Sequence, residues 1–467
     1  MTEVATQADP ESIPAAIFRA YDIRGIAEQQ LTTQSIKRIG QALGSEALDQ
    51  SITSLLVGYD GRLSSPSLSL ALIEGIRSSG CSVVSIGLVP TPLLYFATYT
   101  TAYTSGVMLT ASHNPANYNG LKIVFNRTSL ADNQIQTIRT RIENDQLRTG
   151  SGEFAELVVD RSYIENICRR IQLSKPLKIV IDCGNAVPGK IAPRLFQALG
   201  CDVHPIFCEI DGRFPNHHPD PTVPENLTIL ASTVLEKNAD VGIALDGDGD
   251  RVGLITNRGT FVNADRMLML LVQSILPNYS GRAVVFDVKC SSKLGSLVEH
   301  FGGSPVMHRS GHSFMKQKMQ ETDAILGGEF AAHIFIKDDW FGFDDGLYVA
   351  ARLLEIISES SASSDQIFDQ FVTGFSTPEV KVEVPEERKF ALMDRLLELA
   401  SFPTAKLITL DGLRVEYADG WGLVRASNTS PALLLRFEAD TQTRMNEIQE
   451  QFRRLILSAD KNLEIGF

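Results

Sequence analysis

The alternation of apolar and polar segments along the chain repeats the same order of elements three times. In each repeat an apolar strand ends in Asp, a turn rich in Gly and Ser follows, and a helical segment leads to Gly and a second strand. The aspartates and the later glycines are Asp60 with Gly80, Asp182 with Gly200, and Asp287 with Gly303. Similar elements at similar spacing predict three related βαβ domains.

A further apolar strand in each repeat runs directly into a polar loop. The strands GVMLT, VGIAL and AILG lead into the loops ASHNP, DGDGDR and GEFAAH. In mostly parallel sheets, binding sites collect just beyond the carboxyl ends of the strands. We therefore expect the three loops to occupy equivalent places, where they could line one shared cleft.

The last hundred residues follow a different pattern. A charged strand and helix, a hairpin-containing sheet and a closing amphipathic helix predict a separate α+β domain. The fold class is therefore α/β, with three topologically related mixed α/β domains followed by a C-terminal α+β domain. We expect the boundaries to be 1–158, 159–260, 261–372 and 373–467.

Composition and charge narrow the possible partners. The chain has 467 residues, 43% of them hydrophobic and 21% charged, and a formal net charge of −13. This balance argues against nucleic acid or an anionic membrane as the main partner. The six cysteines form no CxxC pair, and neither an export signal nor a run of 18 uncharged apolar residues is present. We therefore expect reduced thiols and a cytoplasmic protein without a membrane span.

The DGDGDR loop has the pattern of a metal site. Asp246, Asp248 and Asp250 alternate with glycines, so all three carboxylates can face one point and offer oxygen ligands to a hard divalent cation. An EF-hand is excluded, because its sixth and twelfth positions would be Arg251 and Asn257 instead of Gly and Glu. A solvated acidic turn is the alternative interpretation.

Ser112 lies at the tip of a strand-to-loop transition, in TASHNP, with His113 beside it. A Ser-His-Asp hydrolase is not favoured, because the G-x-S-x-G elbow is absent and residues adjacent in sequence rarely orient a serine and its base. An ordinary turn rich in Ser and Asn is as good an interpretation from these residues alone. The acidic loop favours chemistry, because a phosphorylated serine would be a natural fourth ligand for the cation.

Three other segments carry candidate polar groups. RASNTSP gathers the guanidinium of Arg425, hydroxyls and an amide, a set that suits a phosphate dianion. GEFAAH offers Glu329 and His333 to sugar hydroxyls. FRAYDIRG brings two arginines to an apolar segment near the N-terminus. Taken alone, RASNTSP is better interpreted as a hydrogen-bonded turn between strands, and GEFAAH equally well as a surface turn. The arginines of FRAYDIRG could simply snorkel at a core edge.

Together, FRAYDIRG, TASHNP, DGDGDR, GEFAAH and RASNTSP resemble the α-D-phosphohexomutase family, and most closely the bacterial phosphomannomutase/phosphoglucomutases. The resemblance spans nearly the whole chain and implies four domains around a central cleft. It implies that Ser112 is a phosphoserine and that one Mg²⁺ is bound by Ser112, Asp246, Asp248 and Asp250.

The resemblance also assigns roles to other residues. It implies that His113, Lys122, Arg251 and Arg24 act at the transferring group, with Lys122 a candidate for proton transfer or charge neutralisation. The implied substrate contacts are Arg19, Tyr21, His312, Glu329, His333, Arg425, Ser427, Asn428 and Thr429. The chain departs from the G-E-x-S-G-H pattern of many relatives at Ala331 and Ala332, so one sugar hydroxyl contact is expected to be lost or replaced.

The implied activity is a phosphotransferase-type isomerase of carbohydrate metabolism. It would interconvert hexose 1-phosphate and 6-phosphate of glucose or mannose, with a hexose 1,6-bisphosphate as intermediate and activator. Its partners would be small sugar phosphates, and the protein would be a monomer or homodimer. A phosphoglucosamine mutase, a phosphoserine-dependent sugar phosphatase and a non-catalytic sugar-phosphate sensor stay open as alternatives.

Overall fold

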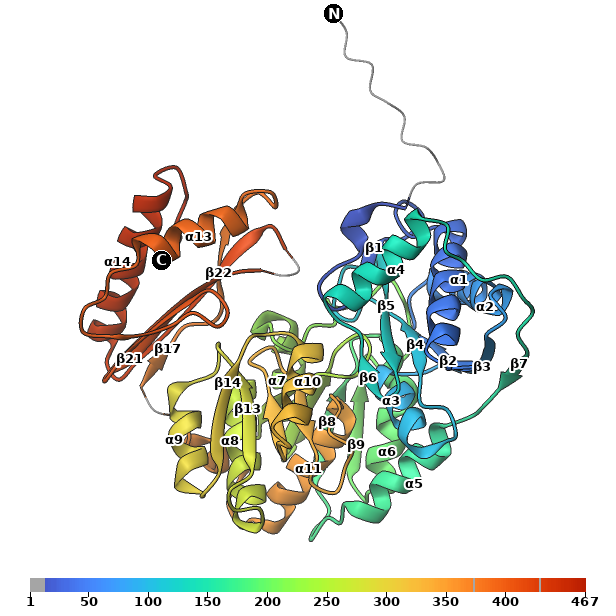
Figure 1. The fold of residues 1–467 in the computed structure, drawn as a ribbon. Helices are drawn as coiled ribbons and strands as arrows, with labels where there is room; N and C mark the ends of the chain where they lie inside the picture. The colour runs from blue at the N-terminus through green and yellow to red at the C-terminus, as the bar shows by residue number, and fades with distance from the viewer. Residues whose placement is uncertain (1–12, 373, 428–429) are drawn as a thin grey trace, which may run out of the picture. The chain divides into compact units, whose positions relative to one another are not determined.

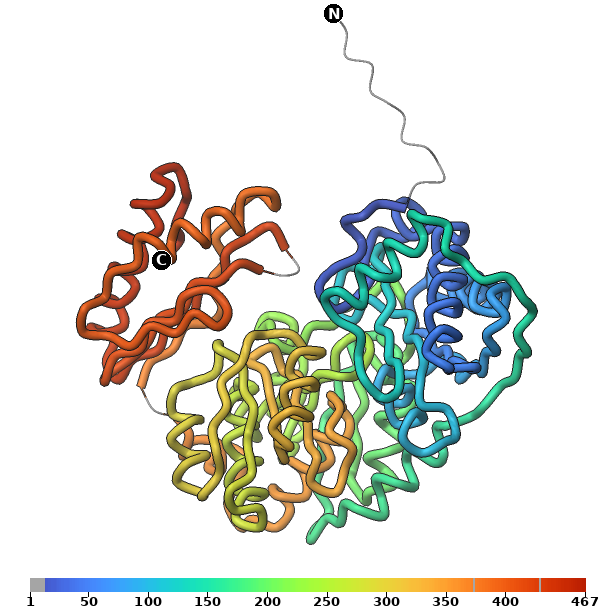
Figure 2. Tube along the Cα trace, in the orientation of Figure 1, coloured from blue at the N-terminus to red at the C-terminus, as the bar shows by residue number. Residues whose placement is uncertain are grey.

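The computed structural model describes residues 13–372, 374–427 and 430–467. The chain forms two compact units, one of Met1–Val262 with Asp339–Ser364, the other of Asn263–Asp338 with Asp365–Phe467. Figure 1 labels the helices and strands of each unit, and Figure 2 traces the chain through them. Within the described residues, no helix combines the length and the apolar run that a membrane crossing requires.

The first sheet has the strand order β1-β5-β4-β2-β3-β7, with β6 beside β5. Its strands are β1 (Ile23–Ile26), β2 (Ser54–Tyr59), β3 (Ser82–Leu88), β4 (Gly106–Leu109), β5 (Tyr118–Phe125), β6 (Thr128–Ser129) and β7 (Phe154–Glu156). The accompanying helices are α1 (Thr33–Asp49), α2 (Ser65–Ser78), α3 (Thr91–Thr100) and α4 (Asn133–Glu143). A capping box between Thr32 and Ser35 begins α1, which satisfies backbone N–H groups that the helix itself leaves unpaired.

The second sheet, in the same unit, has the order β12-β11-β10-β8-β9. Its strands are β8 (Lys178–Asp182), β9 (Asp202–Ile206), β10 (Val241–Leu245), β11 (Val252–Thr256) and β12 (Phe261–Val262). The helices around it are α5 (Asp160–Arg170), α6 (Ala192–Ala198), α7 (Thr228–Lys237) and α11 (Gly346–Glu359). The sequence boundaries assign α11 to the third domain, yet it packs beside β10 and β11. Its buried apolar face explains this packing.

An aromatic cluster fixes the segment that precedes α11. Trp340 stacks on Tyr348 with ring centroids 4.3 Å apart, and Phe341 stacks on Tyr99 of α3 at 5.0 Å. Phe96, also on α3, lies 5.9 Å from Trp340. The cluster therefore ties residues 340–348 to the first sheet's helix α3.

The third sheet belongs to the second unit and has the order β14-β13-β15-β16. Its strands are β13 (Ala283–Asp287), β14 (Ser304–His308), β15 (Leu326–Gly328) and β16 (Ile334–Ile336). Its helices are α8 (Ala264–Ile275), α9 (Ser292–His300) and α10 (His312–Glu321), while α12 (Ser364–Asp369) follows α11 where the chain passes between the units.

The three sheets confirm the predicted repeat. In each, the second, first, third and fourth core strands lie side by side in that order: β3-β2-β4-β5, β9-β8-β10-β11 and β14-β13-β15-β16. The first three are parallel and the fourth is antiparallel. The continuous apolar runs of β4, β10 and β13 follow from burial along their whole length, as expected for covered parallel strands.

The C-terminal part is the predicted α+β domain. Its strands are β17 (Phe375–Ser376), β18 (Val380–Glu383), β19 (Lys406–Ile408), β20 (Leu413–Tyr417), β21 (Gly420–Ala426) and β22 (Ala432–Ala439). They form one antiparallel sheet. Its helices, α13 (Lys389–Leu399) and α14 (Gln442–Ala459), supply apolar side chains to the same core as the sheet.

Candidate functional site

The acidic loop between β10 and β11 brings its three carboxylates to one point. Asp246, Asp248 and Asp250 are fully buried, and each offers an oxygen within 4.8 Å of the others. Gly249 adopts a left-handed φ of +79°, which lets the loop curl. The interpretation as a solvated acidic turn is wrong, because none of the three side chains reaches solvent.

Lys122 of β5 supplies the opposing charge. Its ammonium lies 2.7 Å from Asp248 Oδ2 and is also paired with Asp250. Burial and the neighbouring Asp248 raise the pKa of Asp246 to about 7. Burial would also raise the pKa of Asp248, but Lys122 outweighs this effect and holds that pKa below its usual range.

The donor set fits a bound cation. Oδ1 of Asp248 is buried and has no hydrogen-bond partner among the described residues. Arg251 also offsets the charge of Asp246, since its Nε lies 3.9 Å from Asp246 Oδ2. Three buried carboxylates against one ammonium and one guanidinium leave negative charge that a hard divalent cation would neutralise.

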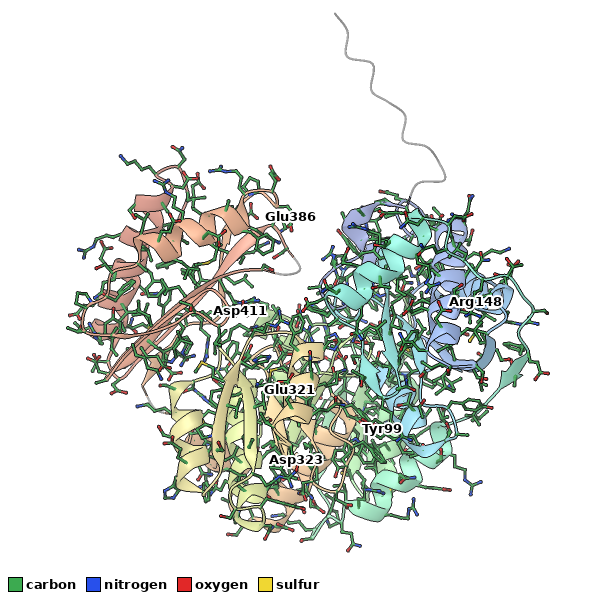
Figure 3. All side chains as sticks on the ribbon, viewed as in Figure 1. Tyr99, Arg148, Glu321, Asp323, Glu386 and Asp411 are labelled. Atoms are coloured by element: carbon green, nitrogen blue, oxygen red, sulfur yellow. The ribbon has the colours of Figure 1, made fainter. Side chains whose placement is uncertain are left out.

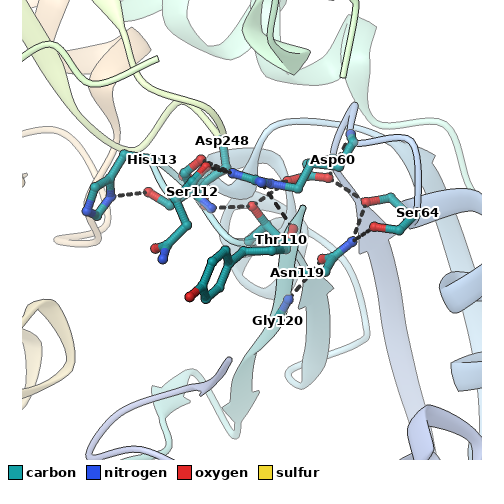
Figure 4. A network of polar contacts seen from close by, with 12 residues as sticks. Asp60, Ser64, Thr110, Ser112, His113, Asn119, Gly120 and Asp248 are labelled. Atoms are coloured by element: carbon teal, nitrogen blue, oxygen red, sulfur yellow. Dashed lines mark hydrogen bonds and ion pairs between the residues drawn. The ribbon is translucent and has the colours of Figure 1, made fainter. Parts of the chain in front are cut away.

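Ser112 lies directly against this acidic loop (Figure 4). Its hydroxyl donates a hydrogen bond to Asp246 Oδ2 at 2.6 Å and lies 3.1 Å from Nδ1 of His113. Its φ of +49° is left-handed, which is uncommon for a residue other than glycine. A Cβ on Gly247 would come within 2.0 Å of the Ser112 carbonyl oxygen, so the two loops approach at backbone distance.

The N-terminal segment adds a cation beside the Ser112 loop. Arg24 of β1 is buried, pairs with Asp22 and donates a hydrogen bond from Nη1 to Asn114 Oδ1 at 2.6 Å. This burial and these contacts argue against the alternative that Arg24 merely snorkels at the core edge. Arg19 and Tyr21 are half-buried in the turn that precedes β1.

In the second unit, the loop between β15 and β16 carries the candidate sugar contacts. Glu329 and His333 are buried, and Oε1 of Glu329 accepts a hydrogen bond from the Gly311 N–H at 2.6 Å. His312, the first residue of α10, has its ring centroid 5.3 Å from that of His333. The structure therefore brings the three predicted side chains of this unit together. Ala332 adopts a φ of +71°, in the left-handed region that favours glycine.

Arg425 is the penultimate residue of β21 and is held by Asp411, which lies between β19 and β20 and is labelled in Figure 3. Its Nε donates to Asp411 Oδ2 at 2.9 Å, and the same oxygen accepts from the Ser310 N–H. Nη2 of Arg425 is buried without a hydrogen-bond partner among the described residues. Ser427 is also buried, whereas the predicted residues Asn428 and Thr429 lie outside the described residues.

Two buried cations, Lys289 and Arg62, were not identified from the sequence. Lys289 lies 3.8 Å from Asp287 and 3.4 Å from Glu379, and it is close enough to Arg425 for the two cations to repel. Arg62 is buried behind the Ser112 loop. Both lie two residues after the aspartate at the end of the first core strand. The threefold repeat was therefore the available signal for both.

Comparison with known proteins gives consistent matches along the chain. Models of the phosphoglucomutase/phosphomannomutase family match α/β/α domain I at residues 15–149, domain II at 161–259, domain III at 263–375 and the C-terminal domain at 379–455. Together they cover most of the sequence.

Individual relatives are similar over nearly their whole length. A phosphomannomutase/phosphoglucomutase from Pseudomonas aeruginosa is 49% identical over 456 residues, 98% of either chain. A phosphoglucomutase from Neisseria gonorrhoeae is 44% identical over 96% of this chain and 98% of its own. The crystal structure of a phosphoglucomutase/phosphomannomutase family protein from Burkholderia thailandensis matches with a TM-score of 0.93 and 42% identity, over 98% of this chain and 100% of that one.

Proposed function

This chain belongs to the phosphoglucomutase/phosphomannomutase family, and from that premise we propose that it interconverts hexose 1-phosphates and 6-phosphates through phosphorylated Ser112. The observation that carries the proposal is the 2.6 Å hydrogen bond from the Ser112 hydroxyl to Asp246, within a buried group of three carboxylates. A hydroxyl in that place is next to the charge that a phosphoryl group and its counter-ion would need.

Asp246, Asp248 and Asp250 would hold one Mg²⁺ together with the phosphate on Ser112. The unpaired, buried Oδ1 of Asp248 supports this assignment. When bound, the cation would supply the positive charge that phosphoryl transfer requires at the oxygens of the moving group.

The protein's own residues divide the work of the transfer step. A sugar hydroxyl attacks the phosphorus and loses its proton to water, the bond between phosphorus and the sugar oxygen forms, and the bond between phosphorus and Ser112 Oγ breaks. His113, with Nδ1 3.1 Å from that Oγ, is placed to give a proton to the leaving oxygen and to take it back in the reverse step. Lys122, Arg251 and Arg24 neutralise the negative charge that surrounds the reaction.

Residues of the second unit would hold the rest of the substrate. Glu329, His333 and His312 are the contacts for sugar hydroxyls. Arg425 and Ser427, with Lys289, would bind the phosphate that is not being transferred, helped by Asn428 and Thr429. Arg19 and Tyr21 complete the proposed substrate contacts.

The first transfer gives a hexose 1,6-bisphosphate. If this intermediate turns end over end, the phosphate that the substrate brought faces Ser112. Transfer of that phosphoryl group to Ser112 releases the isomerised hexose phosphate and restores the phosphoserine. The names of the similar proteins support glucose and mannose phosphates as substrates. Glu329 and His333 would have to bind sugar hydroxyls in both orientations of the intermediate, so we expect tolerance of both O2 configurations. We place the enzyme in the cytoplasm, where its free cysteines would stay reduced.

Turnover assays on glucose, mannose and glucosamine 1-phosphates, with Mg²⁺ and glucose 1,6-bisphosphate, test the proposal. We expect both glucose and mannose 6-phosphates to form, with no stoichiometric release of inorganic phosphate. Free phosphate without a bisphosphate requirement would instead indicate a phosphatase, and conversion of the glucosamine ester alone would indicate a glucosamine-phosphate mutase. Binding without turnover would leave only a sensor.

A further inference from the structure

Arg62 uses every N–H group of its side chain in a buried network behind the Ser112 loop. Its Nη2 donates to the carbonyl oxygens of Ser112 and Asn114, both at 2.7 Å. Its Nη1 donates to the carbonyl oxygens of Pro115 at 2.6 Å and Tyr118 at 3.1 Å. The fifth donor, Nε, bonds to Asp60 Oδ2 at 3.1 Å. A guanidinium has five donors, so none is left for a ligand.

Asp60 holds the other side of the same peptide segment. Its Oδ2 also accepts a hydrogen bond from Thr110 Oγ1 at 2.7 Å, and its Oδ1 accepts one from Ser65 Oγ at 2.5 Å. Thr110 Oγ1 in turn accepts a hydrogen bond from the Ser112 backbone N–H at 2.9 Å. Figure 4 shows Asp60, Thr110 and Ser112 in this chain of contacts.

Both backbone polar groups of Ser112 are therefore held from behind, the N–H through Thr110 and the C=O through Arg62. Fixing the two peptide groups that flank a residue restricts its φ and ψ. Ser112 needs such restraint, because its left-handed φ of +49° is intrinsically unfavourable for a residue with a Cβ. That conformation accompanies the contact of its hydroxyl with Asp246.

We propose that Arg62, anchored by Asp60, is a positioning residue for phosphoryl transfer, which holds the Ser112 loop in the one backbone conformation that presents the hydroxyl to the acidic loop. Arg62 contacts neither substrate nor the reacting atoms in this proposal. The effect of Arg62 on the reaction rate rests on the proposed function of Ser112, whereas its effect on the order of the Ser112 loop is independent of that function. Lysine cannot replace it, because a single ammonium cannot reach four carbonyl oxygens and a carboxylate in this fan.

The test compares Arg62→Lys with wild type in the full-length protein, using two independent readouts. Hydrogen exchange of the amides in residues 112–118 should become about tenfold faster or more, because the loop loses most of its side-chain restraints. The kcat for glucose 1-phosphate should fall about 100-fold while KM changes by less than about threefold, because the nucleophile is misplaced but the sugar contacts are intact.

Two further variants keep the test decisive. Arg141→Lys is the matched control: Arg141 pairs with Glu46 and Asp49 in the same unit, so its loss should leave loop exchange and kcat near wild type. Thr110→Val removes the hydrogen bond from the Ser112 N–H and the one from Thr110 to Asp60, but leaves all five Arg62 donors engaged. It should give the same two changes in smaller measure, even if Arg62→Lys fails to fold.

Three results would overturn the proposal or its premise, and they are distinguishable. Unchanged exchange at 112–118 in both Arg62→Lys and Thr110→Val would show that the network does not hold the loop. Faster exchange with unchanged kcat would show that holding the loop does not matter for transfer. A wild-type protein that isomerises no hexose phosphate would refute the proposed function and the rate effect, while the exchange data would still decide whether Arg62 restrains the loop.

Discussion

Two equivalent places in the repeat, here called corners, carry an aspartate and, two residues later, a buried cation: Asp60 with Arg62, and Asp287 with Lys289. The two cations serve different purposes. Asp60 and Arg62 follow β2, whereas Asp287 ends β13 and Lys289 comes two residues later. Each aspartate ties down the loop after the third core strand of its own sheet. Asp60 accepts from the side chain of Thr110 at 2.7 Å, and Asp287 accepts from the backbone N–H of Phe330 at 3.1 Å.

Arg62 and Lys289 differ in whether they can still interact with a bound ligand. Arg62 spends all its donors on protein groups, so its corner is a fixed support for a nucleophile. Lys289 is a single compact charge between carboxylates; burial lowers its pKa, but Glu379 and Asp287 outweigh that effect and raise it. A compact charge of this kind can be shared with a bound anion. We therefore expect changes at the first corner to lower kcat and changes at the second to raise KM.

The largest effect is expected at the nucleophile itself. Ser112→Ala removes the hydroxyl that forms the covalent intermediate, so turnover should fall by at least about 10⁴-fold. Steady-state assays of glucose 1-phosphate conversion measure this. The exposed serine variant Ser67→Ala should keep wild-type turnover, and residual activity within tenfold of wild type in Ser112→Ala would refute the covalent role.

Gly247→Ala should lower kcat next most strongly, by about 100-fold. The new Cβ would stand 2.0 Å from the Ser112 carbonyl oxygen, so the acidic loop and the serine loop must separate. The control is Gly295→Ala in α9, where the nearest atom lies 3.6 Å from the added Cβ. Equal kcat values for the two variants would contradict the close approach of the loops.

At the other corner, Lys289 lies close to Arg425, the second cation proposed to bind the phosphate that is not transferred. Arg425→Lys should raise KM about 10-fold or more and leave kcat within about threefold. Replacing a fork of donors by one ammonium weakens phosphate binding in both the ground and transition states. KM and kcat for glucose 1-phosphate decide the matter. A loss confined to kcat would remove the distinction between the two corners.

A smaller effect, on stability, is expected from Ala332→Gly. Ala332 has a φ of +71°, so glycine should raise the free energy of unfolding by about 0.5–1 kcal/mol. Urea denaturation provides the measurement. Ala331→Gly is the matched neighbour and should show no gain; equal changes in the two variants would argue against strain at Ala332.

The third equivalent aspartate, Asp182, holds a titratable partner in place of a permanent cation. Burial lowers the pKa of His217, but its contact with Asp182 at 3.0 Å outweighs this and raises the pKa above its usual value. The pair therefore stabilises the fold fully below about pH 6.5, and this contribution is lost as pH rises through the raised pKa. His217→Gln should cost about 1 kcal/mol at pH 5.5 and less at pH 9, by urea denaturation. A cost independent of pH would exclude a charged pair.

Much of the fold was accessible from the sequence because its signals are local. Apolar runs that end in Asp at Asp60, Asp182 and Asp287 predicted the repeated strands, and the structure confirms them. The packing of α11 beside the second sheet was not predictable, because a buried amphipathic face does not name its partner.

The candidate site was predicted only where side chains carry a recognisable pattern. The alternating aspartates alone predicted a cation site, whereas the roles of Lys122 and Arg24 were inferred from the resemblance to the family. Beyond the place of Arg62 in the repeat, nothing in the sequence indicated what it does, because four of its five partners are backbone carbonyl oxygens that every sequence possesses. The left-handed conformation of Ser112 was likewise not predictable, because serine has no intrinsic preference for a positive φ.

The most direct test of the account follows the phosphoryl group on Ser112. The protein is incubated with Mg²⁺ and glucose 1,6-bisphosphate, then chased with glucose 1-phosphate, and the peptide containing Ser112 is analysed by mass spectrometry at each stage. The account predicts that Ser112 gains a phosphoryl group and passes it to the sugar during the chase, as fast as turnover. Full turnover with Ser112 never phosphorylated, or with a phosphoryl group that stays on Ser112 through the chase, would contradict it.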